Sequence, residues 1–266
     1  MIVPNLILSL FQGIGMLDEG FVKNGFCVVT GPERILNGDI RNFSGVPNVF
    51  AGVIGGSPCQ SFSGLNRNPD GYSEEMKNEF EIIVEECQPL WFLLENVVRV
   101  PDCKINGYYV QRFNISPRDL GFKQSRPRTF QYGSKVGYIL ELPEPVHNDS
   151  EFVGCLTASD GTKTNRRTFL EFCKLQGLDH EPELENFTKT AKYRAVGNGV
   201  HIGVSNVIAR LIANVTTSQN PTTIFNTKIC ACGCGRIPSG NNKSYSDACR
   251  QRLSKKRKSS LLSELV

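Results

Sequence analysis

The sequence lacks the long hydrophobic runs and leader signals that mark membrane-spanning and secreted proteins. Its most apolar stretch, residues 2–17, is interrupted by glycines after about ten residues, which is too short to cross a bilayer. No cluster of basic residues precedes this stretch, and no small-residue cleavage site follows it. We therefore expect a protein with no membrane partner that is built around one large core, with residues 6–11 as a buried strand.

The ten cysteines do not form the pattern of a disulfide scaffold. Six are scattered singly through a long chain without secretory signals, which favours a reducing cytoplasm. The other four lie between residues 230 and 249, which indicates a separate small module there. The six scattered cysteines are Cys27, Cys59, Cys87, Cys103, Cys155 and Cys173.

Charge is distributed unevenly along the chain. Residues 228–258 hold nine Lys or Arg against one Asp, and residues 259–266 hold one Glu, so the net charge of +4 leaves residues 1–227 with about −3. A mildly acidic body with a basic tail is typical of a protein whose tail contacts a polyanion such as nucleic acid. The alternative is that Lys255 to Lys258 form only a solvated end.

Strand and helix patterns alternate along the first hundred residues. Apolar runs of strand length are followed by turn residues and then by apolar residues at helical spacing. This alternation predicts an α/β fold with a largely parallel sheet. After residue 97 the pattern is short and irregular until a last amphipathic helix. The expected strands are 6–11, 26–30, 49–54 and 90–94, and the expected helices begin at Met16, cover Met76 to Cys87 and cover Val204 to Ile212.

Glycines separate the first expected strand from the first helix. Gly13 and Gly15 let the backbone approach a bound cofactor, and the helix that follows offers free N–H groups. An ordinary turn between a strand and a helix fits the same residues, because the third glycine of the dinucleotide-binding fingerprint is missing. Two carboxylates downstream favour a cofactor: Glu33 can accept hydrogen bonds from ribose hydroxyls, and Asp39 from an exocyclic amine.

A cysteine lies in a loop of small residues after the third expected strand. Most single cysteines are core residues, but the glycines and the proline around Cys59 have no purpose in a packed core. Glu95 and Asn96 follow the next strand, and the carboxyl ends of parallel strands share one edge of a sheet. A thiolate beside a carboxyl group suits attack on an electron-poor ring. Arg126 and Arg128 suit binding of phosphate or carbonyl oxygens, or are surface residues.

In this order, the segments resemble the conserved blocks of the DNA (cytosine-5) methyltransferases over nearly all of residues 6–213. The resemblance implies a Rossmann-like, S-adenosylmethionine-dependent methyltransferase fold with a mostly parallel sheet. The order of the blocks carries more weight than any single one. The matching segments are SLFQGIG (9–15), Glu33, GDI (38–40), GGSPCQSFS (55–63), ENV (95–97), QSRPR (124–128), LEFCKLQG (170–177) and GNGV (197–200).

The resemblance also implies DNA (cytosine-5) methyltransferase activity on a cytosine flipped out of double-stranded DNA. Cys59 would attack C6 of the base while Glu95 hydrogen-bonds N3 and the exocyclic amine. C5 would then take the methyl group, and Cys59 would be expelled after C5 loses its proton. Asn96 would orient the glutamate or the nucleophile loop, and Arg128 with Arg126 would hold the base oxygen or that loop. The implied cofactor contacts are Phe11, Gly13, Ile14, Gly15, Glu33, Asp39, Ile40, Pro58, Asn198 and Val200.

The chain departs from the family pattern at several positions. Met16 stands where the family usually has a glycine, Ser9 where it often has an aspartate, and Ser57 where a proline is common. The family reads its target sequence with a large region before the LQG block, whereas residues 130–166 give only about thirty-five residues. We expect a short recognition sequence, relaxed specificity, or help from the C-terminal module.

The C-terminal module offers four thiols for a tetrahedral zinc site, Cys230, Cys232, Cys234 and Cys249. It resembles small zinc modules appended to phage and bacterial DNA-associated proteins. Free thiols are the alternative, because the usual C-x2-C spacing is absent. The predicted division of the chain is a catalytic and cofactor-binding core at 1–130, a very reduced target-recognition region at 131–166, the rest of the core at 167–213, a linker at 214–227, a zinc-binding module at 228–258 and a tail at 259–266.

Two other functions fit the same blocks. A branch of the family that is also short of a recognition region methylates tRNA, and a catalytically inactive relative would act as a DNA-binding module. The presence of Cys59, Glu95 and Asn198 argues against the inactive relative, and the basic module favours DNA over RNA. We expect a monomer in the cytoplasm of a bacterial or phage-infected cell, serving restriction-modification or the marking of phage DNA.

Overall fold

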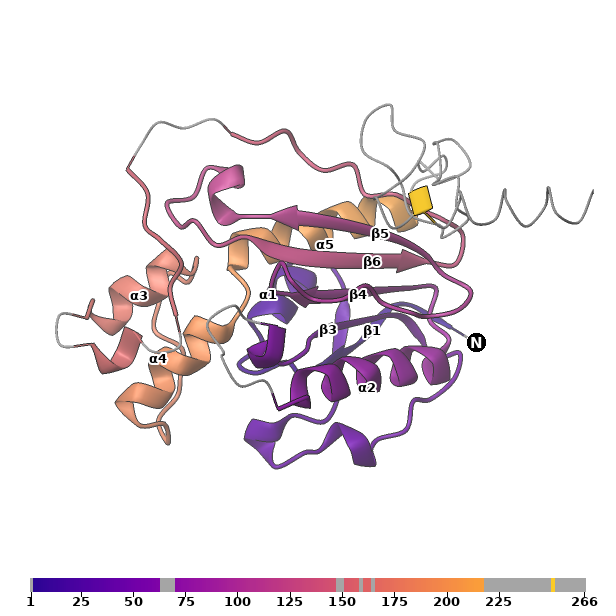
Figure 1. Cartoon of the computed structure of the whole chain (residues 1–266), viewed down its shortest axis with the longest axis horizontal. Coiled ribbons are helices and arrows are strands. Elements are labelled where there is room, and N and C mark those ends of the chain that lie inside the picture. The colour runs from indigo at the N-terminus through magenta and orange to yellow at the C-terminus, as the bar shows by residue number, and fades with distance from the viewer. Residues whose placement is uncertain are drawn as a thin grey trace, which may run out of the picture.

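A six-stranded sheet in the order β2-β1-β3-β4-β6-β5 forms the centre of the molecule (Figure 1). The computed structural model describes residues 2–62, 70–146, 151–157, 160–163, 166–217 and 250–251. The first four strands along the chain are parallel, whereas β6 pairs with β4 in antiparallel fashion and β5 pairs in antiparallel fashion with β6. The sheet confirms the predicted α/β fold with mostly parallel strands. The strands are β1 (Val3–Leu10), β2 (Cys27–Thr30), β3 (Phe50–Gly56), β4 (Trp91–Asn96), β5 (Tyr109–Ile115) and β6 (Arg128–Ser134).

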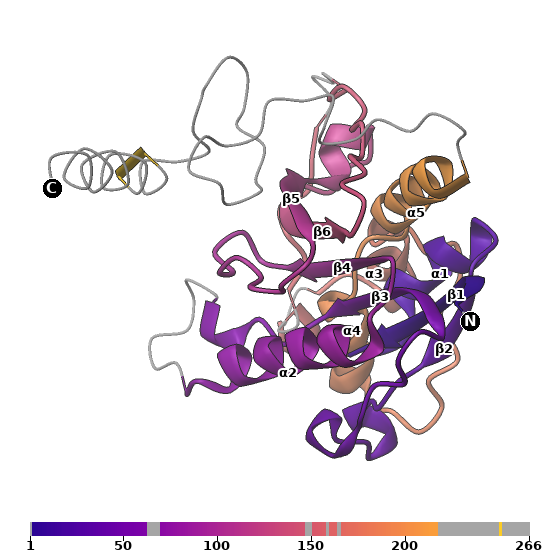
Figure 2. The same ribbon diagram turned by 90° about the vertical axis from the view of Figure 1, so that its right-hand side faces the viewer.

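Helices cover both faces of the sheet. α1 (Met16–Lys23) and α5 (Ile202–Thr217) pack together on one face, and α2 (Tyr72–Cys87) covers the other (Figure 2). Successive side chains of a strand point to opposite faces, so β4 supplies Trp91 and Leu93 to the α1 and α5 side and its alternate residues to the α2 side. A strand buried on both faces reads as a continuous apolar run, which explains why β1, β3 and β4 are visible in the sequence.

Two further helices lie beyond the strand ends, beside the edge where β3 and β4 finish (Figure 1). α3 (Phe169–Leu175) and α4 (Lys189–Asn198) pack around Phe172 and Tyr193, and Met16 of α1 joins this third cluster. The cluster fixes the end of α4 against the start of α1. Short 3-10 turns complete the description: η1 (Arg34–Leu36), η2 (Ile40–Asn42), η3 (Gln60–Phe62), η4 (Pro117–Leu120) and η5 (Asp160–Thr162).

Two predicted boundaries differ from the structure. Residues 131–134, assigned from the sequence to the recognition region, belong to β6 and pair with both β4 and β5. Residues 214–217, assigned to the linker, continue α5, because Val215 packs on the core and Thr216 bonds back to the carbonyl of Ile212. The part of the recognition region outside the sheet is therefore even shorter than predicted.

The described residues contain no helix with both the length and the apolar character needed to cross a bilayer. The six scattered cysteines all fall within the described ranges, and each is a free thiol there.

Candidate active site

The loop that carries Cys59 and the side chain of Glu95 lie at the carboxyl ends of two adjacent strands. Gly56 ends β3 and is the register partner of Glu95 on β4, and Cys59 follows Gly56 by three residues. A Cβ atom on Gly56 would lie 3.1 Å from Oε2 of Glu95, so the glycine leaves room for the carboxyl group beside the strand end. The structure thus brings together the two groups that the sequence predicts as nucleophile and acid.

Burial and neighbouring charges shift the pKa values of Cys59 and Glu95. Burial raises the pKa of the Cys59 thiol and the Glu95 carboxylate raises it further, while the guanidinium groups of Arg128 and Arg126 act in the opposite direction. Glu95 is 8% exposed, and burial raises the pKa of its carboxyl group more than the two arginines lower it. Burial outweighs the ion pair here because a carboxylate away from water loses its hydration. Glu95 therefore keeps its proton to a higher pH than an exposed glutamate.

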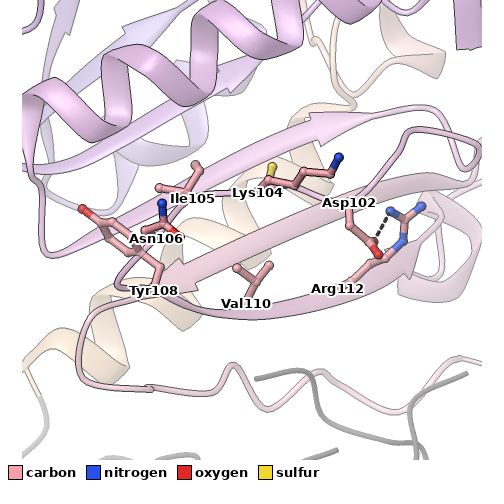
Figure 3. Close-up of a pocket in the computed structure, with 8 residues that line it drawn as sticks. Asp102, Lys104, Ile105, Asn106, Tyr108, Val110 and Arg112 are labelled. Carbon is pink, nitrogen blue, oxygen red and sulfur yellow. Dashed lines mark hydrogen bonds and ion pairs between the residues drawn. The ribbon is translucent and has the colours of Figure 1, made fainter. Parts of the chain in front are cut away.

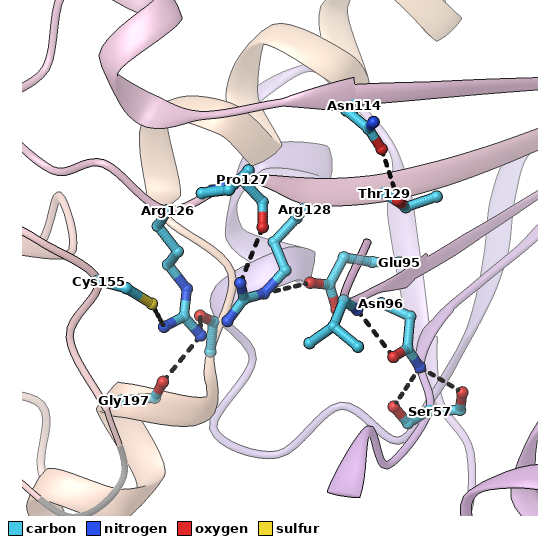
Figure 4. Close-up of polar contacts among 12 residues, drawn as sticks. Ser57, Glu95, Asn96, Asn114, Arg126, Pro127, Arg128, Thr129, Cys155 and Gly197 are labelled. Carbon is cyan, nitrogen blue, oxygen red and sulfur yellow. Dashed lines mark hydrogen bonds and ion pairs between the residues drawn. The ribbon is translucent and has the colours of Figure 1, made fainter. Parts of the chain in front are cut away.

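Arg128 faces Glu95 directly. Its Nε lies 3.3 Å from Oε1 of the carboxyl group, and its Nη1 donates to the carbonyl of Pro127 (Figure 4). Arg128 begins β6, and the antiparallel pairing of β6 with β4 places this strand start opposite the strand end that carries Glu95. The arrangement puts a fixed positive charge beside the acid.

Asn96 connects β4 to the nucleophile loop. Its Nδ2 donates to the carbonyl oxygen of Ser57 at 2.9 Å and to the Oγ of Ser57 at 3.0 Å, while its Oδ1 accepts from the N–H of Val97 (Figure 4). Ser57 is buried, and the half-buried Pro58 and Cys59 come next. Of the two roles that the sequence left open for Asn96, the contacts favour orientation of the loop. Ser57 departs from the family pattern, and its side-chain hydroxyl supplies one of these contacts.

Arg126 lies differently from its sequence prediction, which placed it with Arg128 on the base oxygen or the loop. The side chain is 3% exposed, and its guanidinium group donates to the backbone carbonyls of Leu156 at 2.6 Å and Gly197 at 2.9 Å. Its charge still reaches the site, since it acts on both Glu95 and Cys59. The N–H groups of Arg126 are occupied by backbone carbonyl groups from segments that are distant in the sequence.

The turn after β1 has a backbone that suits a close ligand. Phe11 has a φ of 55°, which costs a bulky residue strain, and Gly13 and Gly15 have φ values of 60° and 78°. A Cβ atom built on either glycine would have nothing within 4 Å, so open space lies above both. Ile14 between them packs partly against the third core cluster. The turn is thus fixed in place with an open face.

Polar groups around this turn also fit a nucleoside ligand. Glu33 is 9% exposed, and its Oε2 accepts from the N–H of Gly13 at 2.8 Å while its Oε1 accepts from the N–H of Ile35 at 3.1 Å. The Oε1 of Gln12 is buried and, within the described residues, has no hydrogen-bond donor. A carboxylate and an orphaned acceptor beside the open glycines fit the adenosyl group of S-adenosylmethionine.

Four other residues that are predicted to contact the cofactor differ in their exposure and in their partners. Asn198 is exposed and is the last residue of α4. The side chains of Ile40 and Val200 are buried in the core, and their predicted contact with a cofactor stays a prediction. The carboxylate of Asp39 binds the guanidinium group of Arg41, which holds the pKa of Asp39 at about 2.

Sequence analysis missed a buried acid next to this turn. Asp18 on α1 is 7% exposed, and its Oδ1 accepts from the hydroxyl of Ser9 at 2.6 Å. Burial raises the pKa of its carboxyl group to about 6, against a smaller opposing effect of the Ser9 hydrogen bond. The available signal was the departure at position 9, where the chain has a serine and supplies a carboxyl group from the helix instead.

Two other candidate sites, the predicted zinc module and a surface hollow, give less support for a function. The four cysteines of the predicted zinc module lie outside the described residues, and within those residues no three His, Cys, Asp or Glu side chains are grouped as a metal site. A hollow of about 220 Å³ lies along β5 (Figure 3), lined by residues of the segment 102–112. None of the predicted site residues lines it.

Comparison with known proteins gives matches to one family. The sequence profile described as C-5 cytosine-specific DNA methylase matches residues 6–152. The type II methyltransferase M.NgoPII of Neisseria gonorrhoeae is 29% identical over 190 residues, which are 59% of this chain and 56% of that protein. M.MthTI of Methanothermobacter thermautotrophicus is 31% identical over 176 residues, which are 53% of each. The chain thus spans about half the length of these relatives.

Solved structures agree in fold. The Entamoeba histolytica methyltransferase EhMeth superposes with a TM-score of 0.59 at 13% identity, covering 80% of this chain and 99% of that one. A putative DNA modification methyltransferase encoded within an E. coli prophage gives a TM-score of 0.57 at 19% identity, with coverage of 80% and 99%. Because the profile match extends over more than half of its residues, the chain belongs to the C-5 cytosine-specific DNA methylase family.

Proposed function

We propose that this chain transfers a methyl group from S-adenosylmethionine to C5 of a cytosine flipped out of double-stranded DNA, through a covalent adduct with Cys59. The observation that carries the proposal is the register of Gly56 with Glu95, which sets the nucleophile loop beside a buried acid. The names of M.NgoPII and M.MthTI, both type II methyltransferases, support DNA modification as the setting. Monomeric state, cytoplasmic location and the zinc module stay predictions.

The chemistry follows from the two groups at the strand ends. The thiolate of Cys59 forms a bond to C6, the π electrons of the C5–C6 double bond move to C4–C5, and those of the C4–N3 double bond move onto N3. Glu95 in its protonated form donates to N3 and accepts from the exocyclic amine, which stabilises that electron density. Arg128, beside Glu95, is the proposed donor to the base carbonyl. After methylation a base removes the C5 proton, the double bond forms again, and the bond from C6 to sulfur breaks.

The cofactor would be held at the open turn after β1. Phe11 would pack on the adenine, the backbone of Gly13 and Gly15 would face the ligand, and Glu33 would accept from the ribose hydroxyls. When bound, S-adenosylmethionine supplies an electrophilic methyl group. Asn198, at the end of α4, would complete the cofactor side of the site.

Methyl transfer from tritiated S-adenosylmethionine tests the proposal. We expect label in unmethylated duplex DNA with the wild-type chain and none with Cys59→Ala. A duplex that carries 5-fluorocytosine should trap the adduct, because fluorine at C5 cannot leave as a proton does, and the trapped complex should survive denaturing electrophoresis. Cys59→Ser is the matched control for trapping.

The same assay separates the alternatives. Label on tRNA alone would overturn the DNA substrate and favour the RNA-methylating branch, which shares a short recognition region. No label on either nucleic acid, together with retained DNA binding, would favour an inactive binding module. Bisulfite sequencing of DNA from cells that express the chain would then give the target sequence.

A further inference from the structure

We propose that Arg126 and Gln176 are positioning residues that clamp the end of α4, and that Arg126 thereby couples Asn198 to the recognition segment, residues 151–157. The inference rests on the proposed function, because it assigns Asn198 to the cofactor side of the site. It gives Arg126 a different task from that of Arg128.

The clamp acts on carbonyl groups at the end of α4, where a helix has few backbone donors of its own. Gln176 donates from Nε2 to the carbonyls of Val196 at 2.7 Å and Gly199 at 3.3 Å. Arg126 donates from Nη2 to Gly197 at 2.9 Å and to Gly199 at 3.3 Å. The two side chains therefore hold the backbone on both sides of Asn198.

Gln124 orients the clamp. Its Nε2 donates to the Oε1 of Gln176 at 3.0 Å and to the carbonyl of Leu175 at 3.1 Å. Both glutamines have an exposed fraction of 0%. An amide held at its oxygen by one partner has its NH₂ group aimed in a fixed direction, here at the end of α4. The QSRPR and LQG blocks thus meet on the backbone of the GNGV block.

The other half of the Arg126 guanidinium group holds the recognition segment. Nη1 donates to the carbonyl of Leu156 at 2.6 Å and contacts the Sγ of Cys155 at 3.5 Å (Figure 4). Leu156 is itself 1% exposed in the third core cluster. Because a guanidinium group is planar and rigid, a shift of Leu156 must be passed to Gly197 or break a buried hydrogen bond.

Arg126 and Arg128 differ in burial, and this difference gives them different roles. The Nη atoms of Arg126 are taken by backbone oxygens in a site that is closed to solvent, so a flipped base cannot use them without dismantling the clamp. Arg128 is more exposed and lies against Glu95. Apart from the charge that it places near Glu95 and Cys59, Arg126 therefore acts on the reaction through Asn198 and the segment 151–157, not through contact with the base.

Binding and hydrogen exchange test the clamp without methyl transfer. We expect Arg126→Lys to weaken S-adenosylhomocysteine binding by about tenfold in calorimetry, the loss of roughly one buried charged hydrogen bond. Amide exchange should accelerate in both 151–157 and 197–200, whereas Gln176→Leu should loosen only 197–200. Adding Asn198→Ala to Arg126→Lys should weaken binding little further, because both changes act on the same contact.

Arg112→Lys is the matched control, because Arg112 also clamps backbone carbonyls, those of Val98 and Val100. It should leave S-adenosylhomocysteine binding unchanged. An Arg126→Lys protein with normal binding and normal exchange but lower kcat would overturn the inference and return Arg126 to the base. If that variant does not fold, unchanged binding in Gln176→Leu would overturn it equally. Weakened binding in a chain that methylates no nucleic acid would leave the clamp standing and reject the proposed function instead.

Discussion

Burial and neighbouring charges together set the reactivity of the Cys59 thiol. Burial raises the pKa of Cys59 most, the carboxylate of Glu95 raises it further, and the guanidinium group of Arg128 lowers it. Since the thiolate is the reactive form, removing either charge changes the rate of alkylation at a fixed pH. We expect iodoacetamide to modify Cys59 about threefold faster in Glu95→Gln and about threefold slower in Arg128→Gln at pH 8.

Peptide mass spectrometry reads this prediction at one thiol. Cys27 is exposed and serves as an internal control whose rate should be equal in all three proteins. Equal rates at Cys59 in Glu95→Gln and the wild type would mean that the carboxyl group is too far away, or already neutral at that pH, to act on the thiol.

Asp18 makes stability depend on pH. Its pKa rises from 3.8 to about 6 on folding, so the folded chain binds this proton more tightly than the unfolded chain. The stabilisation that comes from the protonated form is complete below about pH 4 and is lost as the pH rises through 6. A shift of this size corresponds to about 3 kcal/mol of unfolding free energy.

Asp18→Asn tests the effect, because asparagine keeps the acceptor for Ser9 and cannot ionise. Urea unfolding at pH 4.5 and pH 7.5 should show a smaller loss of stability on going to the higher pH in Asp18→Asn than in the wild type. The variant should also be the more stable protein at pH 7.5. A wild type and a variant with parallel pH dependence would place the titration elsewhere.

At the scale of helices and strands, Met16 and Gly199 depend on each other. Met16 is 2% exposed, and a Cβ atom on Gly199 would lie 2.2 Å from its Sδ. The methionine that replaces the usual glycine of the cofactor turn thus fills space that the glycine of the GNGV block leaves free. This packing joins the start of α1 to the end of α4, the two helix ends at the proposed cofactor site.

We expect Gly199→Ala to lower the free energy of unfolding by about 1–3 kcal/mol, because the added methyl group overpacks a filled site. Shortening Met16 to Ala in the same chain should recover part of the loss, so the two changes should not be additive in chemical denaturation. Gly154→Ala is a suitable control, since a Cβ there meets nothing within 4 Å. Additive losses would show that the two residues do not compete for space.

The burial of each strand and helix explains whether its sequence pattern could predict it. β3, β4 and the second half of β1 are buried and read as apolar runs, and α2 and α5 show one apolar face. β5 and β6 were missed because Gln111, Arg112 and Gln131 interrupt them, and α4 because its sequence has little apolar periodicity.

Some features of the site could be predicted from the sequence, and others could not. The convergence of Cys59 and Glu95 could be predicted, because strand ends of a parallel sheet share one edge. The task of Arg126 could not, because its partners are the carbonyls of Leu156 and Gly197, and a backbone carbonyl leaves no mark on a sequence. Side chains that bind side chains are easier to pair in advance than side chains that bind backbone.

For the whole molecule, net charge opposes the proposed substrate. Residues 1–227 carry a net charge of about −3, and DNA repels such a body unless basic groups are concentrated where it binds. The recognition region supplies few residues for this purpose, since β6 takes the first four of those assigned to it. The basic residues of the tail are a second source of a favourable field, beside any local concentration of basic groups on the body.

Replacing Lys255, Lys256, Arg257 and Lys258 with glutamine in the full chain tests whether the tail contacts DNA. Each phosphate contact contributes about 0.9 to the slope of log affinity against log salt, so loss of four should reduce the slope by about 3 to 4. Affinity for duplex DNA should fall most at low salt, while trapping by 5-fluorocytosine at saturating DNA should persist, because the reacting groups are untouched. A salt dependence identical to that of the wild type would show that these four residues are only a solvated end. DNA would then have to be held by the body, against its net charge, or by the five basic residues that remain between residues 228 and 252.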